Sequence, residues 1–178
     1  MMVREAKAKA VFLNDRLIAE KHKVSLELYD KSRYGEVVGD KIHYSMFEGL
    51  YLLEKKKLNI KDSKAKAIKF DKYIAKAIRK DKEFLTKYYV FKDMRDRGYI
   101  VKTALKFGAE FRVYDRGIKP GDDHAKWILY PVHERDTLTW HGFSAKNRVA
   151  HSTRKTLLIG VVDEETDVTY YNVAWLRP

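Results

Sequence analysis

Residues 106–114 read Lys-Phe-Gly-Ala-Glu-Phe-Arg-Val-Tyr, and this alternation of side chains predicts a β-strand. Successive side chains of a strand point to opposite faces. Four apolar residues would therefore share one face: Phe107, Ala109, Phe111 and Val113. Arg112 and Tyr114 would share the other face. We expect Tyr114 to end the strand with its hydroxyl directed away from the core.

The sequence around this stretch mixes strands with helices. Strands are predicted over residues 99–103, 127–132, 156–162 and 168–175, and helices over about 85–97 and 144–155. Gly98 is placed to end the first of these helices in a left-handed conformation. The mixture indicates an α/β (α+β) domain with a mixed sheet.

Before residue 85 the pattern predicts a smaller α+β domain. Short strand-like pieces cover residues 10–13, 24–29 and 35–44. Ser45 and Glu48 form a capping-box pattern that opens a helix over about 46–57, and helical spacing returns over 70–84. We place the domain boundary near residue 85, which gives one domain at 1–84 and another at 85–178.

Composition allows buried cores and favours an anionic partner. The 178 residues are 45% hydrophobic, and 37 Lys plus Arg against 25 Asp plus Glu leave a formal charge of +12. Such an excess suits a polyanion, although a lysine-rich solvated surface, as in a thermophile, explains it equally well. The chain has no Cys, which excludes disulfides, thiolate metal sites and a Cys nucleophile.

The sequence predicts a cytoplasmic protein with no membrane partner. No apolar run approaches the roughly 18 to 20 residues that span a bilayer. Residues 1–10 also lack the apolar core of a signal peptide.

Common catalytic motifs are missing. None of the six His forms a zinc-helix pair or an HExxH motif, and there is neither a GxSxG elbow nor a phosphate-binding P-loop. The more informative residues lie in the C-terminal half. His124 follows a loop with three turn-forming residues: Gly117, Pro120 and Gly121. Arg148, His151 and Lys155 fall at i, i+3 and i+7, which predicts one stripe of a helix, although a cationic stripe also complements the helix dipole.

Four ordered runs resemble the tRNA splicing endonuclease family. They are Tyr-Ile-Val-Lys-Thr at 99–103, Phe-Gly-Ala-Glu-Phe at 107–111, Tyr-Asp-Arg-Gly at 114–117 and Arg-Val-Ala-His-Ser-Thr-Arg-Lys at 148–155. The resemblance covers residues 85–178 well and the first domain more loosely. It implies a catalytic triad of Tyr114, His124 and Lys155 in the second domain. We expect the first domain to act as a scaffold.

The resemblance also implies a reaction without a metal or a cofactor. Tyr114 would accept the proton of the RNA 2′-hydroxyl, His124 would protonate the leaving 5′-oxygen, and Lys155 would stabilise the phosphorane. The products would be a 2′,3′-cyclic phosphate and a 5′-hydroxyl. Because an ordinary phenol titrates near 10, a nearby cation must help the base, and Lys155 is the candidate.

The same resemblance implies a substrate and an assembly. The substrate would be precursor tRNA with two bulges separated by a short helix. Arg148 would act in trans and clamp a bulged base bound at the opposing subunit. Trp175 is either the second plate of this clamp or a buried interface residue. Assembly into a homotetramer, or a heterotetramer with a paralogous structural subunit, would use an acidic hairpin and the last strand. The residues concerned are Asp163, Glu164, Glu165, Asp167, Tyr170 and Tyr171.

Two other functions stay open at this point. One is a non-catalytic RNA-binding or structural subunit, which would share the fold and the charge. The other is a metal-dependent nuclease, because three carboxylates lie close to His124: Asp115, Asp122 and Asp123.

Overall fold

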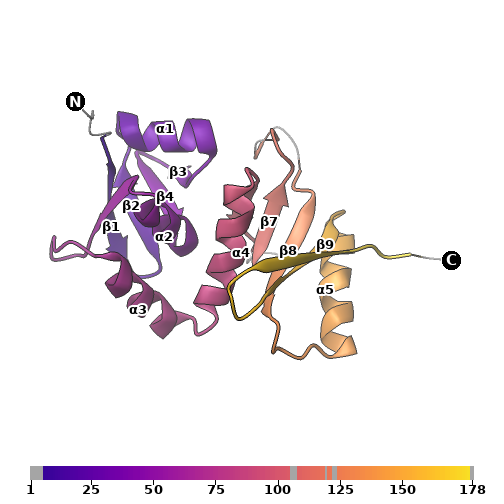
Figure 1. Ribbon diagram of the computed structural model, residues 1–178. Helices are drawn as coiled ribbons and strands as arrows, with labels where there is room; N and C mark the ends of the chain where they lie inside the picture. The colour runs from indigo at the N-terminus through magenta and orange to yellow at the C-terminus, as the bar shows by residue number, and fades with distance from the viewer. Residues whose placement is uncertain (1–5, 105–107, 119, 122–123, 177–178) are drawn as a thin grey trace. The chain divides into compact units, whose positions relative to one another are not determined.

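The computed structural model in Figure 1 describes residues 6–104, 108–118, 120, 121 and 124–176. The chain divides into two units, Met1–Lys82 and Glu83–Pro178. Each unit combines helices with a mixed five-stranded sheet, which confirms the α+β fold class. None of the helices in the described part of the chain is long and apolar enough to cross a membrane.

The sheet of the first unit has the strand order β3-β4-β2-β1-β5. Its strands are β1 (Ala8–Leu13), β2 (Arg16–Glu20), β3 (Glu36–Val38), β4 (Lys41–Ser45) and β5 (Leu58–Lys61). β5 runs parallel to β1, and the other neighbours are antiparallel. The helices of this unit are α1 (Lys23–Ser32), α2 (Met46–Glu54) and α3 (Phe70–Lys80).

The predicted capping box at the start of α2 is confirmed. The Ser45 hydroxyl accepts a hydrogen bond from the Glu48 backbone N–H at 3.2 Å, and the Glu48 carboxylate accepts from the Ser45 N–H at 2.9 Å. Glu48 is buried and also accepts from the Gly35 N–H at 3.0 Å. One carboxylate therefore joins the helix start to a turn 13 residues earlier.

The strand predicted over residues 24–29 is wrong, because this segment belongs to α1. Local hydrogen bonds explain the difference: Ser25 accepts from the His22 N–H at 3.0 Å and donates to the Glu20 carbonyl at 2.6 Å. The alternation of Val24, Leu26 and Leu28 imitated a strand. Residues 35–44 are likewise not one strand, since Gly39 has φ +61° and turns the chain between β3 and β4.

The sheet of the second unit has the strand order β10-β9-β8-β7-β6. Its strands are β6 (Ile100–Thr103), β7 (Phe111–Tyr114), β8 (Trp127–His133), β9 (Thr156–Val162) and β10 (Val168–Val173). β8 and β9 are parallel and the other neighbours antiparallel, so the sheet is mixed, as predicted.

Helices α4 (Phe84–Asp96) and α5 (Trp140–Ser152) pack on this sheet (Figure 1). The α4 side includes Phe91 against Phe111, with ring centroids 5.8 Å apart. A buried cluster on the α5 side contains Ala109, Ile128, Ala150 and Leu157. Gly98 has φ +89° just after α4, which confirms its predicted role in ending that helix.

Two strand boundaries in this unit differ from the predictions. β7 begins only at Phe111, because Gly108 turns the chain with φ +68°, and Ala109 joins the α5-side cluster rather than the face of Phe111. Lys106 and Phe107 lie outside the described residues. β10 ends at Val173, so Trp175 follows the strand instead of ending it.

The predicted helical stripe through Lys155 is also wrong. α5 runs from Trp140 to Ser152, and Arg154 then adopts a left-handed conformation with φ +55°. The Lys155 N–H closes the turn by donating to the Ala150 carbonyl at 2.8 Å. Lys155 therefore lies in the connection between α5 and β9, apart from the stripe of Arg148 and His151.

Candidate active site

Strand pairing brings the segments of the predicted triad to one end of the strands of the second sheet. Tyr114, the last residue of β7, pairs with Ile100 at the start of β6. The preceding residue of β7 pairs with Trp127 at the start of β8, and Trp127 pairs with Thr156 at the start of β9. Adjacent strands are roughly 4.8 Å apart, so the backbones of Tyr114 and Lys155 are separated by about 10 Å.

Tyr114 lies on the predicted face of β7 but is buried. It points to the face opposite Val113, as the alternation requires. Its side chain is only 5% exposed, and this burial was not expected from the sequence; the direction of its hydroxyl stays a prediction. The guanidinium of Arg112 lies 6.0 Å from the centre of its ring. Arg112 is a cation near Tyr114 that the sequence analysis did not assign, although both residues were predicted on one face.

His124 is exposed in the connection between β7 and β8. Its neighbour Ala125 is buried, and the Lys126 N–H donates to the Val113 carbonyl at 2.9 Å. These two contacts hold the C-terminal end of the connection against the sheet. Asp122 and Asp123, considered above as metal ligands, lie outside the described residues.

An ion pair closes the base of this connection. The Lys126 ammonium lies 2.8 Å from the Asp115 carboxylate, one residue after β7 and one before β8. The hydrogen bonds that Asp115 accepts from this ammonium and from the Arg116 N–H hold the pKa of its carboxyl below the usual range. Residue types alone did not indicate this pairing.

Aromatic rings with cations over them flank the ion pair. The Arg116 guanidinium lies 5.0 Å from the centre of the Tyr99 ring, and the Lys126 ammonium lies 4.4 Å from that of Trp127. The Tyr99 and Trp127 rings meet edge to face at 5.8 Å. The Trp127 ring N–H donates to the Asn172 side chain of β10 at 3.2 Å. This cluster links the connection that carries His124 to β8, to β10 and to the residue before β6.

Lys155 is half-buried at the same end of the strands. Its ammonium donates a hydrogen bond to the Thr153 carbonyl at 2.8 Å. The left-handed turn at Arg154 lets the chain leave α5 and enter β9 directly. The turn therefore sets Lys155 at the start of β9, two strands from Tyr114.

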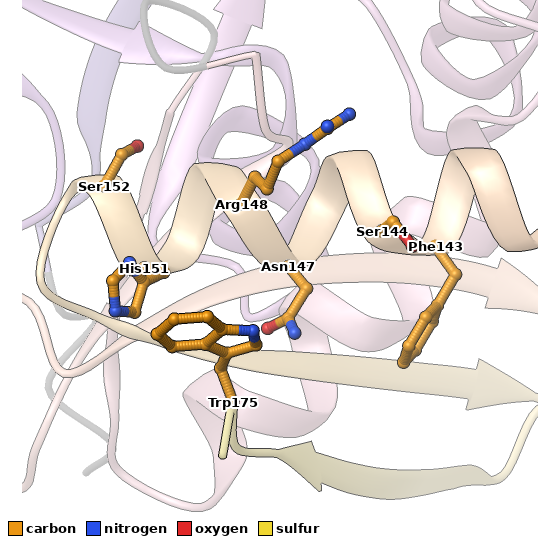
Figure 2. Close-up of a pocket in the computed structure, with 7 residues that line it drawn as sticks. All are labelled: Phe143, Ser144, Asn147, Arg148, His151, Ser152 and Trp175. Atoms are coloured by element: carbon orange, nitrogen blue, oxygen red, sulfur yellow. The ribbon is translucent and has the colours of Figure 1, made fainter. Parts of the chain in front are cut away.

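Arg148 and Trp175 line a common pocket of about 540 Å³ between α5 and the segment after β10 (Figure 2). Trp175 is 53% exposed in this chain, and its ring meets the His151 ring at 4.4 Å and 63°. In Figure 2 the Arg148 side chain points away from Trp175, while Asn147 and His151 lie on the side of the ring. The structure thus brings the two predicted clamp residues to one pocket without facing their planes toward each other.

The acidic hairpin joins β9 to β10 and uses its carboxylates in different ways. The Asp163 carboxylate accepts from the N–H groups of Glu165 and Asp167 at 3.0 and 2.9 Å, which shapes the turn. Glu164 pairs with Arg135 of the same chain at 2.5 Å. Within the described residues, Glu165 and Asp167 have no ion pair.

The two tyrosines of β10 have different surroundings. The Tyr170 hydroxyl donates to Asp93 of α4 at 2.8 Å, and burial together with the Asp93 contacts raises the pKa of this phenol. Tyr171 is 57% exposed. β10 is an edge strand, so Tyr171 stands on a sheet edge whose other neighbour is open among the described residues. Across all the residues that the structure describes, no group of three or more His, Asp or Glu side chains is placed to hold a metal ion.

Sequence comparisons match both units to one family. Residues 84–170 match the family described as tRNA intron endonuclease, catalytic C-terminal domain, and residues 8–74 match tRNA intron endonuclease, N-terminal domain.

Similar curated proteins come from archaea. A protein of Thermococcus onnurineus (strain NA1), named tRNA-splicing endonuclease, is 42% identical over 163 residues, which cover 92% of this chain and 93% of that protein. A protein of the same name from Pyrococcus horikoshii is 40% identical over 92% of this chain and 93% of its own length. Another from Nanoarchaeum equitans is 40% identical over 80% of this chain and 94% of its own length. With both units matched and this identity along most of its length, the chain belongs to the tRNA intron endonuclease family.

Proposed function

We propose that this chain is a catalytic subunit of a tRNA splicing endonuclease. It would cut precursor tRNA at exon–intron junctions within a bulge-helix-bulge, without a metal or a cofactor. The observation that carries the proposal is the register of β7, β8 and β9 in a member of this family. The segments of Tyr114, His124 and Lys155 adjoin the paired ends of these three strands.

The proposed reaction uses the nucleophile that RNA already contains. Tyr114 takes the proton from the 2′-hydroxyl, whose oxygen attacks the adjacent phosphorus. His124 gives a proton to the departing 5′-oxygen. Lys155 stabilises the negative charge of the phosphorane, so the products are a 2′,3′-cyclic phosphate and a 5′-hydroxyl. The exposure of His124 supports this role because a proton donor must reach an RNA that arrives from solvent.

The chemistry is tested with purified chain and a bulged precursor tRNA in excess EDTA. We expect cleavage to continue and the 3′ ends to resist phosphatase until the cyclic phosphate is opened. Loss of cleavage in EDTA, with recovery on adding magnesium, would establish a metal-dependent nuclease instead.

The residue assignment is tested with Tyr114→Phe and His124→Ala. Each variant should lose at least about a hundredfold in single-turnover rate, with RNA binding largely kept, because each removes one proton-transfer group. His141→Ala is a suitable control, since His141 is an exposed imidazole of α5 outside the triad. A near-normal rate in either triad variant refutes the assignment, and no cleavage by the unaltered chain favours a non-catalytic subunit.

Substrate binding and assembly extend the same proposal. Arg148 and Trp175 would hold a bulged base bound at the active site of another subunit; the exposure of both side chains beside one pocket supports this. In the hairpin, Glu165 and Asp167 are the carboxylates left for a positive pocket on a neighbour, because Glu164 is paired with Arg135 within its own chain. Residues 1–84 would act as a scaffold for the catalytic residues 85–178. The particle would be a homotetramer or a heterotetramer with a paralogous structural subunit.

A further inference from the structure

Five lysines line a pocket in the first unit that no step of the proposed reaction uses. The pocket has a volume of about 500 Å³. It lies between α1, the residues before β1 and the turn from α2 to β5. We call it the lysine pocket, and its charged residues are Lys7, Lys23, Lys31, Lys56, Lys57 and Glu27.

Strand pairing brings two of its segments together. β1 and β5 run parallel with Ala8 opposite Leu58, and the Ala8 N–H donates to the Lys57 carbonyl at 3.1 Å. Lys7 and Lys57 each precede their strand by one residue, so they are neighbours. Lys56 adopts a left-handed conformation with φ +57° in the turn that leads into β5. The positions of these three lysines follow from the sheet itself.

The third segment is one face of α1. Lys23, Glu27 and Lys31 are spaced by four residues, so they follow one another along the same side of the helix. Val24 and Leu28 of the same helix add apolar lining to the pocket. The single carboxylate leaves the pocket with a net charge of +4.

Among the described residues of the first unit, no ion pair neutralises the positive charge of the lysine pocket. All five lysines are exposed, and none forms an ion pair with any residue that the structure describes. Lys41 of the same unit, by contrast, pairs with Glu20 at 3.7 Å. Ammonium groups gathered around one hollow repel each other, so they disfavour the free fold and attract anions.

We propose that the lysine pocket binds phosphate groups of an RNA backbone and thereby forms a second contact with the precursor tRNA. This inference rests on the proposed function for its choice of RNA. Lysine is a compact point charge suited to phosphate, and several ammonium groups match a ligand with several phosphates. Among the described residues that line the pocket none is aromatic, so bases have no ring to stack on and binding should be independent of sequence.

The experiment compares two triple variants of the full chain. The pocket variant carries Lys23→Gln, Lys31→Gln and Lys57→Gln. The control variant carries Lys64→Gln, Lys66→Gln and Lys69→Gln, which remove the same charge from exposed lysines elsewhere in the unit. Both are built with His124→Ala so that the RNA stays intact, and binding of precursor tRNA is measured by fluorescence anisotropy from 50 to 300 mM salt. Matching thermal unfolding shows that both variants fold.

The pocket variant should bind precursor tRNA at least about tenfold more weakly than the unaltered lysines do at 100 mM salt. The slope of log binding constant against log salt concentration should become about 2 to 3 less steep. Both changes should be much smaller in the control variant. Equal losses in both variants would overturn the proposal, since only overall charge would then matter. Binding of tripolyphosphate to the same variants is measured as well. If the pocket variant loses tripolyphosphate binding but keeps its RNA binding, the pocket binds a free polyphosphate and the proposal is overturned.

The catalytic readout separates this proposal from the proposed function. With His124 restored and RNA saturating, the pocket variant should keep its single-turnover rate within about twofold, because the altered lysines do not touch the reacting atoms. If the unaltered chain does not cleave, the proposed function fails while the binding comparison still decides whether the lysine pocket binds RNA.

Discussion

Two charges at the protein surface close the base of the connection that carries His124. The Asp115–Lys126 pair is largely exposed, and pairs of this kind contribute little to global stability. Its value lies in position, because the two residues flank the connection and restrain both of its ends. In the proposed reaction, a loose imidazole would spend less time in line with the leaving oxygen.

Lys126→Met should therefore lower kcat at least about fivefold and change RNA affinity much less. The Asp115→Lys/Lys126→Asp exchange should recover part of the rate, since it restores the pair with the opposite polarity. Single-turnover rates at saturating RNA check both. Arg97→Met, which removes the comparable Arg97–Asp93 pair at 2.7 Å, is the matched control. A normal rate in Lys126→Met would show that the pair does not position His124.

Lys126→Met should raise the pKa of Asp115, because the substitution removes the hydrogen bond and the positive charge of Lys126 that lower this pKa. A carboxyl with a lowered pKa contributes stability above the ordinary Asp value of about 3.9, and this contribution is lost as pH falls through its folded-state value. The Lys126 pair should thus persist into mildly acidic solution. An NMR titration of the Asp115 carboxyl in both proteins measures the change; an unchanged midpoint would show that the pair does not form in solution.

At the scale of the element, α2 depends on a glycine. A Cβ added at Gly49 would approach a methyl group of Leu17 to 2.4 Å and the hydroxyl of Tyr73 to 2.8 Å. That hydroxyl also donates to the Met46 carbonyl at 2.9 Å, so it is not free to move aside. Gly49 thus allows α2 to pack closely on both β2 and α3.

Gly49→Ala should destabilise the first unit by about 1 to 3 kcal/mol, the usual cost of overpacking a core. Gly142→Ala is the control, since Gly142 is also helical and its nearest neighbours would lie 3.3 Å or more from a new Cβ. That change should be neutral or stabilising by up to about 1 kcal/mol. Calorimetric unfolding distinguishes the two. Equal stability of Gly49→Ala and the unaltered chain would mean that Leu17 and Tyr73 repack without cost.

At the scale of the whole molecule, the edge of β10 is the strongest candidate for self-association. Tyr171 is more than half exposed, while the hydroxyl of the preceding Tyr170 donates a hydrogen bond to Asp93 of its own chain. An edge strand with exposed aromatic surface tends to pair with another strand. We therefore expect this edge to lie at the subunit interface.

Tyr171→Glu should convert the proposed tetramer into smaller particles, as measured by light scattering during size exclusion, because it places like charges where two edge strands would meet. Tyr170→Phe is the control; it removes an intrachain hydrogen bond and should leave the particle size unchanged. A tetramer that survives Tyr171→Glu would move the interface away from this edge. A monomer of the unaltered chain that cleaves at full rate would refute the assembly altogether.

Features encoded within a few residues were readable before the fold was known. The capping box of Ser45 and Glu48, the left-handed Gly98 and the span of β9 all match the structure. Each depends on hydrogen bonds or steric limits between near neighbours in the chain. The resemblance to the family could also be found in the sequence, because the order of the motifs along the chain requires no knowledge of tertiary contacts.

Other features arise only when distant segments meet. The burial of Tyr114, the departure of Lys155 from α5 and the pairing of Asp115 with Lys126 were not predicted. Local pattern cannot supply them, because burial and register depend on which strand lies alongside and which helix covers the face. The chain's local chemistry selected the elements and the candidate groups, whereas long-range packing determined which of those groups share one end of the strands of a sheet.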